Sequence, residues 1–135
     1  MTATEVLKHE HQVVLHVLDA VEKEVASIKK HGTIHASLVR EMVDFFQGFV
    51  DHCHHAKEEK HLFARMHQRG MSTTSGPLAV MVQDHERGRA YIRAIREALP
   101  EKGEPEAAAV GRIAENLSGY ASLLRSHIDK EDNVL

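Results

Sequence analysis

The stretch LKHEHQVVLHVLDAVEKEVASI, residues 7–28, decides the fold. Its apolar residues recur alternately four and three positions apart, which is the spacing of one buried stripe on a helix. The members of this stripe are Leu7, His11, Val14, Leu18, Val21, Val25 and Ile28. Because His11 is the one polar member, the segment predicts a bundle helix that carries a histidine in its buried face.

Two later segments repeat this pattern, and each has a histidine among its apolar residues. The third segment has the stripe Leu78, Met81, His85, Gly88, Ile92, Ile95 and Leu99. The fourth has Ile113, Leu117, Tyr120, Leu124, His127, Glu131 and Val134, so that a glutamate accompanies the histidine. Ionisable side chains at predicted core positions of three helices require a physical explanation.

Three stretches that contain all the prolines separate the segments, at residues 29–33, 69–77 and 100–106. Short connections between helices favour antiparallel neighbours. We therefore predict an all-α fold, an antiparallel up-down-up-down four-helix bundle, with residues 1–135 as a single domain. The chain has no Trp, two Tyr and four Phe, and such an aliphatic core suits helices better than a β-sandwich.

The second segment, residues 34–68, has a wider apolar face. Its best stripe is Leu38, Met42, Phe45, Phe49, His52, Ala56, Glu59, Phe63 and Met66. A neighbouring line, Val43, Phe46, Val50, His54, Glu58 and Leu62, is also largely apolar. Periodicity alone does not say which His–Glu pair points inward, and spacing by itself favours His52 or His55 with Glu59.

The buried histidines are expected to meet at one height in the bundle. In this topology, the early parts of the first and third helices lie beside the late parts of the second and fourth. The histidines at these places are His11, His54 or His55, His85 and His127. His11 and His54 are about equally far along the chain from the turn at Gly32, so at about 1.5 Å per residue they lie at nearly the same height.

A buried layer of four imidazoles and two carboxylates is unstable without a cation. Unpaired buried carboxylates cost on the order of several kcal/mol each, or shift their pKa instead. Neutral imidazoles and ionised carboxylates are natural ligands of divalent metals. A His and a Glu four positions apart lie side by side on a helix, so the layer predicts a metal pair with glutamates as bridges.

The bulk properties exclude several classes of function. A net charge of −3 gives no reason to expect a nucleic-acid partner, and no apolar run reaches the roughly 20 residues of a membrane span. The N-terminus lacks the apolar core of a signal peptide. The single Cys53 excludes an internal disulfide and is compatible with a reducing compartment. We therefore expect a cytoplasmic protein without nucleic-acid or membrane partners.

Two stretches echo each other in register: HHAKEEKHL at residues 54–62 and HIDKEDNVL at residues 127–135. Together with EH at residues 10–11 and DHE at residues 84–86, this pattern resembles the hemerythrin-like HHE cation-binding domain family. The resemblance covers essentially the whole chain. All four pieces in order at helical spacing make it specific, although any one piece is a weak signal.

The resemblance implies six metal ligands, His11, His54, Glu58, His85, His127 and Glu131. It selects His54 with Glu58 over the pair that spacing alone favours. The implied cofactor is two iron ions with an oxo or hydroxo bridge, which zinc or another divalent metal could replace. Six shared ligands leave open positions on each ion. The resemblance thus implies that the protein binds or reduces O2, NO or peroxide, as a sensor, a detoxifier or a repair protein for iron centres.

The sequence departs from that of the oxygen-carrying hemerythrins, which have a fifth histidine one turn along the third helix. Here the positions one turn from His85 are Met81 and Arg89, so the chain looks less like a reversible carrier. Two alternatives stay open: metal storage or a structural metal site without redox turnover, and a metal-free module in which the histidines act as a pH switch. The sequence shows no partner protein, does not separate sensor from enzyme, and does not fix the oligomeric state.

Other histidines and acids have simpler interpretations. We expect six off-stripe histidines to be solvated: His9, His16, His31, His35, His61 and His67. His52 and His55 flank the site and are expected to be incidental rather than ligands, and Cys53 is expected to be a buried structural thiol. Asp132 is the rival of Glu131, because an acid five residues after the histidine serves in true hemerythrins. Glu131 is preferred because Asp132 points off the stripe.

Overall fold

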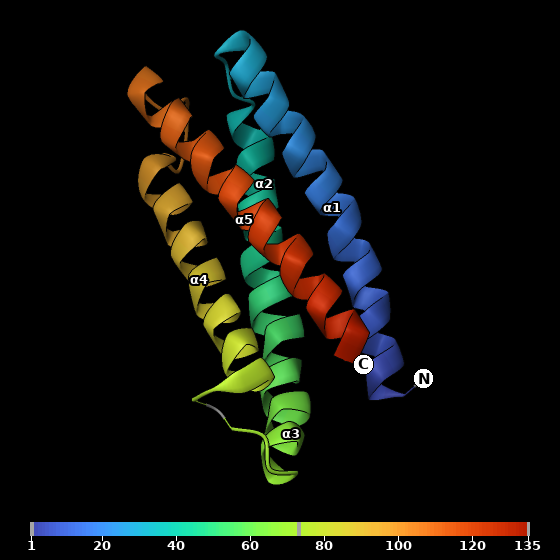
Figure 1. Cartoon of the computed structure of the whole chain (residues 1–135). Coiled ribbons are helices and arrows are strands. Elements are labelled where there is room, and N and C mark those ends of the chain that lie inside the picture. The colour runs from blue at the N-terminus through green and yellow to red at the C-terminus, as the bar shows by residue number, and fades with distance from the viewer. Residues whose placement is uncertain (1, 73, 135) are drawn as a thin grey trace.

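The computed structural model describes residues 2–72 and 74–134, and all regular structure in these ranges is helical (Figure 1). Three of the four rods are single helices, α1 (Ala3–His31), α4 (Gly76–Ala98) and α5 (Ala107–Val134). The second rod is a run of four consecutive pieces, α2 (Ala36–Phe45), η1 (Phe46–His55), η2 (Glu58–Phe63) and α3 (Ala64–Gln68). Figure 1 shows successive rods running in opposite directions, so the predicted four-helix bundle is confirmed.

The ends of the rods follow from local sequence. Thr2 and Glu5 form a capping box at the start of α1, in which each side chain accepts a hydrogen bond from the other's backbone N–H. The helix ends at Gly32, whose φ of 72° places it in the left-handed region that favours glycine. Pro77 lies in the first turn of α4, where a missing N–H removes no helical hydrogen bond.

The predicted stripes of α1, α4 and α5 are buried, including His11, His85 and His127. The side chain of Val134, the last predicted member, lies outside the described residues. Aliphatic side chains such as Leu18 are fully buried, and burying each contributes about 1.5–3 kcal/mol relative to leaving it exposed. The bundle is therefore held together mainly by the stripe residues that the spacing predicts.

The stripe that spacing favoured in the second rod is buried at Met42, Phe63 and Met66, but its middle part is wrong. His52 and Glu59 are exposed, and the burial instead follows the neighbouring line through Val50, His54 and Glu58. Over η2 the backbone takes the wider π-helical turn, with hydrogen bonds five residues apart. This wider turn moves the stripe by one position, so that the next buried residue after Glu58 is Phe63 rather than Leu62. Burial thus passes from the neighbouring line back to the predicted stripe, a change that one α-helical spacing along the whole rod does not describe.

The buried histidines His11, His54, His85 and His127 and the glutamates Glu58 and Glu131 form a polar layer, which lies between two apolar clusters. The larger cluster fills the bundle on one side of the layer and includes Val14 and Val50, which lie next to the histidines along α1 and η1. The smaller cluster consists of Phe63, Met66, Leu78 and Met81 and covers the other side. Apolar residues on both sides exclude water from the layer and strengthen electrostatic interactions within it. No helix in the described part of the chain has an apolar stretch long enough to cross a bilayer.

Candidate metal centre

Four histidines from four rods meet as two pairs. The Nε2 atoms of His11 and His54 lie 3.0 Å apart, and those of His85 and His127 lie 3.1 Å apart. All four side chains are buried. In each pair the two rings are inclined by about 60°, so that their Nε2 atoms point toward a common place. Convergence of this kind is what two imidazoles bound to one ion require.

The outer nitrogen of every one of these rings contacts a carboxylate. His11 Nδ1 is 2.7 Å from Asp132 Oδ1, and His54 Nδ1 is 2.9 Å from Glu10 Oε1. In the other pair the contacts are His85 Nδ1 with Glu59 and His127 Nδ1 with Asp84, each at 3.1 Å. A carboxylate in this position fixes the hydrogen on Nδ1. When both rings of a pair are neutral, their Nε2 lone pairs face each other across about 3 Å, which is repulsive unless a cation lies between them.

Glu58 and Glu131 lie between the two histidine pairs, with 0% and 1% of their surfaces exposed. Oε1 of Glu131 is 3.2 Å from His11 Nε2, and its Oε2 is 3.2 Å from His127 Nε2. Oε1 of Glu58 is 3.3 Å from His54 Nε2 and 3.4 Å from His85 Nε2. Each glutamate thus faces both pairs, as a carboxylate bridging two ions would.

The four oxygens of these two glutamates are buried and have no hydrogen-bond partner among the described residues. Burial, and then the neighbouring Glu131, raise the pKa of Glu58 to about 11. Burial acts in the same direction on Glu131, but its contacts with His11 and His127 outweigh burial and lower its pKa. At neutral pH one of these two adjacent carboxyl groups therefore retains a proton. A divalent cation between the carboxylates would replace that proton.

The imidazoles respond to the same environment. Burial lowers the pKa of His54 to about 4 and that of His85 to about 2, so both rings are neutral, as metal ligands must be. For His11 and His127 burial also favours the neutral ring, but the neighbouring carboxylates outweigh burial and raise the pKa of both rings: Glu131 with Asp132 for His11, and Glu131 with Asp84 for His127. Each pair therefore contains one ring that burial keeps neutral, His54 or His85, and one ring whose proton, like that of Glu58, competes with a metal.

The layer has an internal two-fold symmetry that the sequence echo predicts only in part. The acid that precedes a histidine on an odd rod contacts the histidine on the following even rod, and a lysine contacts that acid. Lys57 Nζ lies 2.7 Å from Glu10, and Lys130 Nζ lies 3.2 Å from Asp84. For Glu10, the hydrogen bonds from Lys57 and His54 outweigh burial and hold its pKa below the usual value. The same set of roles is repeated in both halves of the bundle.

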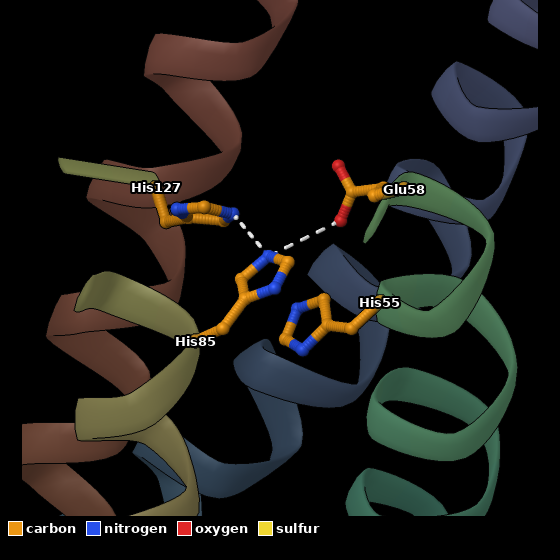
Figure 2. A group of neighbouring side chains, drawn as sticks. All are labelled: His55, Glu58, His85 and His127. Carbon is orange, nitrogen blue, oxygen red and sulfur yellow. Dashed lines mark hydrogen bonds and ion pairs between the residues drawn. The ribbon is translucent and has the colours of Figure 1, made fainter. Parts of the chain in front are cut away.

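His55 breaks this symmetry, because its equivalent in the other half is Ile128. Contrary to the expectation for an incidental residue, His55 is buried and lies with Glu58, His85 and His127 in a group close enough to hold one ion (Figure 2). Its ring stacks on that of His85, with centroids 3.7 Å apart and planes 14° apart. Its lone pairs therefore lie in a plane nearly parallel to that of His85 and do not converge with them as those of His127 do.

The remaining predictions have mixed outcomes. The six off-stripe histidines, His9, His16, His31, His35, His61 and His67, are exposed as expected. His52 is also exposed. It lies outside the group shown in Figure 2 and outside a second group of possible ligands, which consists of His11, His54, Glu58 and Glu131. Cys53 is only half-buried, so its prediction as a buried thiol is wrong. Asp132 lies off the stripe as expected but contacts His11 from outside, a role that spacing along one helix could not reveal.

Comparisons with known proteins agree with this geometry. The sequence model of the hemerythrin HHE cation binding domain matches residues 2–135. Curated relatives include an uncharacterized protein of Mycobacterium bovis and uncharacterized proteins from two strains of Mycobacterium tuberculosis, each 23% identical over all 135 residues of this chain. The chain spans about half the length of these relatives, 52% in each case. No solved structure matches the chain.

Proposed function

Because the chain belongs to the hemerythrin HHE cation-binding domain family, we propose that it binds two iron ions in the polar layer and there binds or reduces small oxidants. The observation that carries this proposal is the pair of opposed Nε2 contacts of about 3 Å whose outer nitrogens are held by carboxylates. The proposed ligands are His11, His54, Glu58, His85, His127 and Glu131.

Each ion would take one histidine pair together with an oxygen from each glutamate. These are four protein atoms, fewer than the about six ligands that octahedral sites accept, so each ion keeps room for a small molecule. Bound iron would supply the electrons, or the binding position, for O2, NO or peroxide. This open coordination favours small-oxidant chemistry over a purely structural site, which closes all positions.

The chain's own residues would perform three tasks around the ions. The outer carboxylates, for example Glu10 and Asp132, hold the rings by their Nδ1 hydrogens so that Nε2 keeps its lone pair. Glu58 and Glu131 balance the positive charge of the ions within an apolar surrounding. The apolar cluster around Phe63 and Met81 keeps bulk water away.

Visible spectroscopy of the aerobically purified protein, before and after addition of NO or hydrogen peroxide, tests this function. We expect a band from ferric iron that changes on addition of either molecule. We also expect Glu131→Gln to lose the band, whereas Glu115→Gln, an exposed change on the same helix, keeps it. A protein that holds metal but shows no spectral response would instead support metal storage or a structural metal site.

A further inference from the structure

A cavity of about 180 Å³ adjoins the polar layer on the side of His85 and His127. Its walls come from η1, α4 and α5, and they include Asp51, His55, Gly88, Arg89 and Tyr120. His55 and His85 both line it, so the cavity reaches the group of side chains proposed to hold one of the ions. The equivalent positions in the other half of the bundle show which residues are specific to this cavity.

The internal two-fold symmetry places apolar residues where the cavity has polar ones. In the register that pairs His54 with His127 and His11 with His85, the polar residues Asp51, His55 and Arg89 correspond to Leu124, Ile128 and Leu15. Leu124 and Ile128 are buried core residues, and Leu15 packs against the same cluster. Apolar side chains at these positions are therefore sufficient for packing of the bundle. Packing does not explain why Asp51, His55 and Arg89 are polar.

Gly88 provides the space. Glycine destabilises a helix interior relative to alanine, and Gly88 lies in the middle of α4 without a positive φ that would require it. A Cβ atom at this position would meet only Tyr120 Cε1, at 3.5 Å, which is an ordinary contact. The corresponding residue of α1 is Val14, whose side chain is buried. Neither backbone conformation nor crowding explains the glycine, whereas the cavity beside it does.

A chain of charged contacts connects the cavity wall to the polar layer. Arg89 Nε lies 2.9 Å from Asp51 Oδ1, which in turn lies 3.8 Å from His55 Nδ1. The same guanidinium contacts Glu59 Oε1 at 3.0 Å, and this oxygen is 3.1 Å from His85 Nδ1. Arg89 thus fixes the outer partners of both histidines that line the cavity. Arg89 also contacts Glu86 Oε1 at 2.6 Å, so three carboxylates share its charge. A small ligand in the cavity would meet these polar groups beside the proposed metal position.

We propose that this cavity is the docking site of the small ligand and that it selects a hydrogen-bonding molecule of a few heavy atoms, such as a peroxide. His55 and Arg89 are its positioning residues. The proposal rests on the proposed function above. It makes the two metal positions unequal, because the ligand reaches the ion of the His85 pair, while apolar side chains take the corresponding place beside the His11 pair.

Azide titration of the iron-loaded protein, followed by visible spectroscopy, tests the proposal. Gly88→Ala adds one methyl group to the cavity without touching a proposed ligand. We expect two irons per chain and an unchanged spectrum without azide, but azide affinity about tenfold or more below that of the wild type. Gly111→Ala makes the same change at an exposed position of α5 with open space around it, and we expect it to bind azide like the wild type.

A second variant tests whether azide binding depends on the polar residues of the cavity and not only on its volume. Arg89→Leu introduces the residue found at the two-fold equivalent position. We expect weaker azide binding when this variant is compared with the wild type at full iron loading, as checked by elemental analysis. If the iron-loaded wild type does not bind azide, or if both variants bind it with wild-type affinity, the docking proposal is wrong while the proposed function stands. Absence of iron from the wild-type protein would overturn the proposed function and, with it, this inference.

Discussion

The Nε2 atoms of His11 and His54 face each other across 3.0 Å, although a carboxylate occupies the outer nitrogen of each ring. When both rings are neutral and their Nδ1 hydrogens are held by carboxylates, neither Nε2 atom has a hydrogen to donate to the other. The same relationship joins His85 and His127. An imidazole pair arranged in this way is organised for a cation, and the following predictions depend on it.

Two neighbouring histidines on η1 are expected to behave oppositely. His54→Ala removes a buried nitrogen proposed to bind iron, and we expect the protein to lose at least one of its two irons. His52→Ala changes an exposed side chain, with 75% of its surface accessible, and should leave the iron content unchanged. Elemental analysis of the purified variants distinguishes these results. Equal iron contents in the two variants would argue against the assignment of His54.

Asp132 should influence metal affinity without binding the metal. Asp132→Asn weakens the contact that fixes the Nδ1 hydrogen of His11, and loss of such an outer partner lowers metal affinity about 10–100-fold. Asp129→Asn, an exposed change on the same helix, is the matched control. Competition with a chelator of known affinity measures both. The role assigned to Asp132 is wrong if the two variants hold iron equally tightly.

Metal affinity should rise with pH. In the metal-free protein the pKa of Glu58 is raised to about 11, and those of His11 and His127 are raised above the usual histidine value. Glu58 therefore carries a proton near pH 7 that the metal must displace, and protons compete more strongly with the metal for His11 and His127 as the pH falls. We expect tighter binding at about pH 8 than at about pH 6, with proton release on binding. Affinity that does not change with pH would contradict this account.

Glu58→Gln should lower the stability of the metal-loaded protein but not that of the metal-free protein. Glutamine resembles the protonated carboxyl group that Glu58 has in the metal-free protein, so the metal-free melting temperature should hardly change. In the loaded protein the variant lacks a bridging carboxylate, and we expect its Tm to fall by about 10 °C or more, given about 4 °C per kcal/mol for a domain of this size. Glu86→Gln, at an exposed position, should match the wild type in both states. A similar loss of Tm without metal would indicate a packing role for Glu58.

The predicted and observed structures agree for features that depend on the spacing of residues along a single helix. The stripes of α1, α4 and α5 follow regular α-helical spacing, so the burial of His11, His85 and His127 could be predicted from the sequence. In the second rod, the π-helical turns of η1 and η2 change the angle between successive side chains. Spacing alone therefore favoured His52 or His55 with Glu59, and the family resemblance was needed to select His54 with Glu58.

Features that depend on how two helices cross could not be predicted. The contacts of Asp132 with His11 and of Glu59 with His85 join residues that are far apart in the sequence. The stacking of His55 on His85 likewise depends on the crossing of η1 and α4. The doubled histidine at residues 54–55 and the wide apolar face of this rod were the available signals, but neither gives a direction in space.

Iron stoichiometry tests the central claim most directly. The protein should contain two irons per chain when it is purified after growth with sufficient iron, as measured by elemental analysis against protein concentration from amino-acid analysis. Protein that contains no transition metal, and takes none up when it is incubated with ferrous iron without oxygen, would contradict the claim that the opposed histidine pairs and the two buried glutamates form a metal centre.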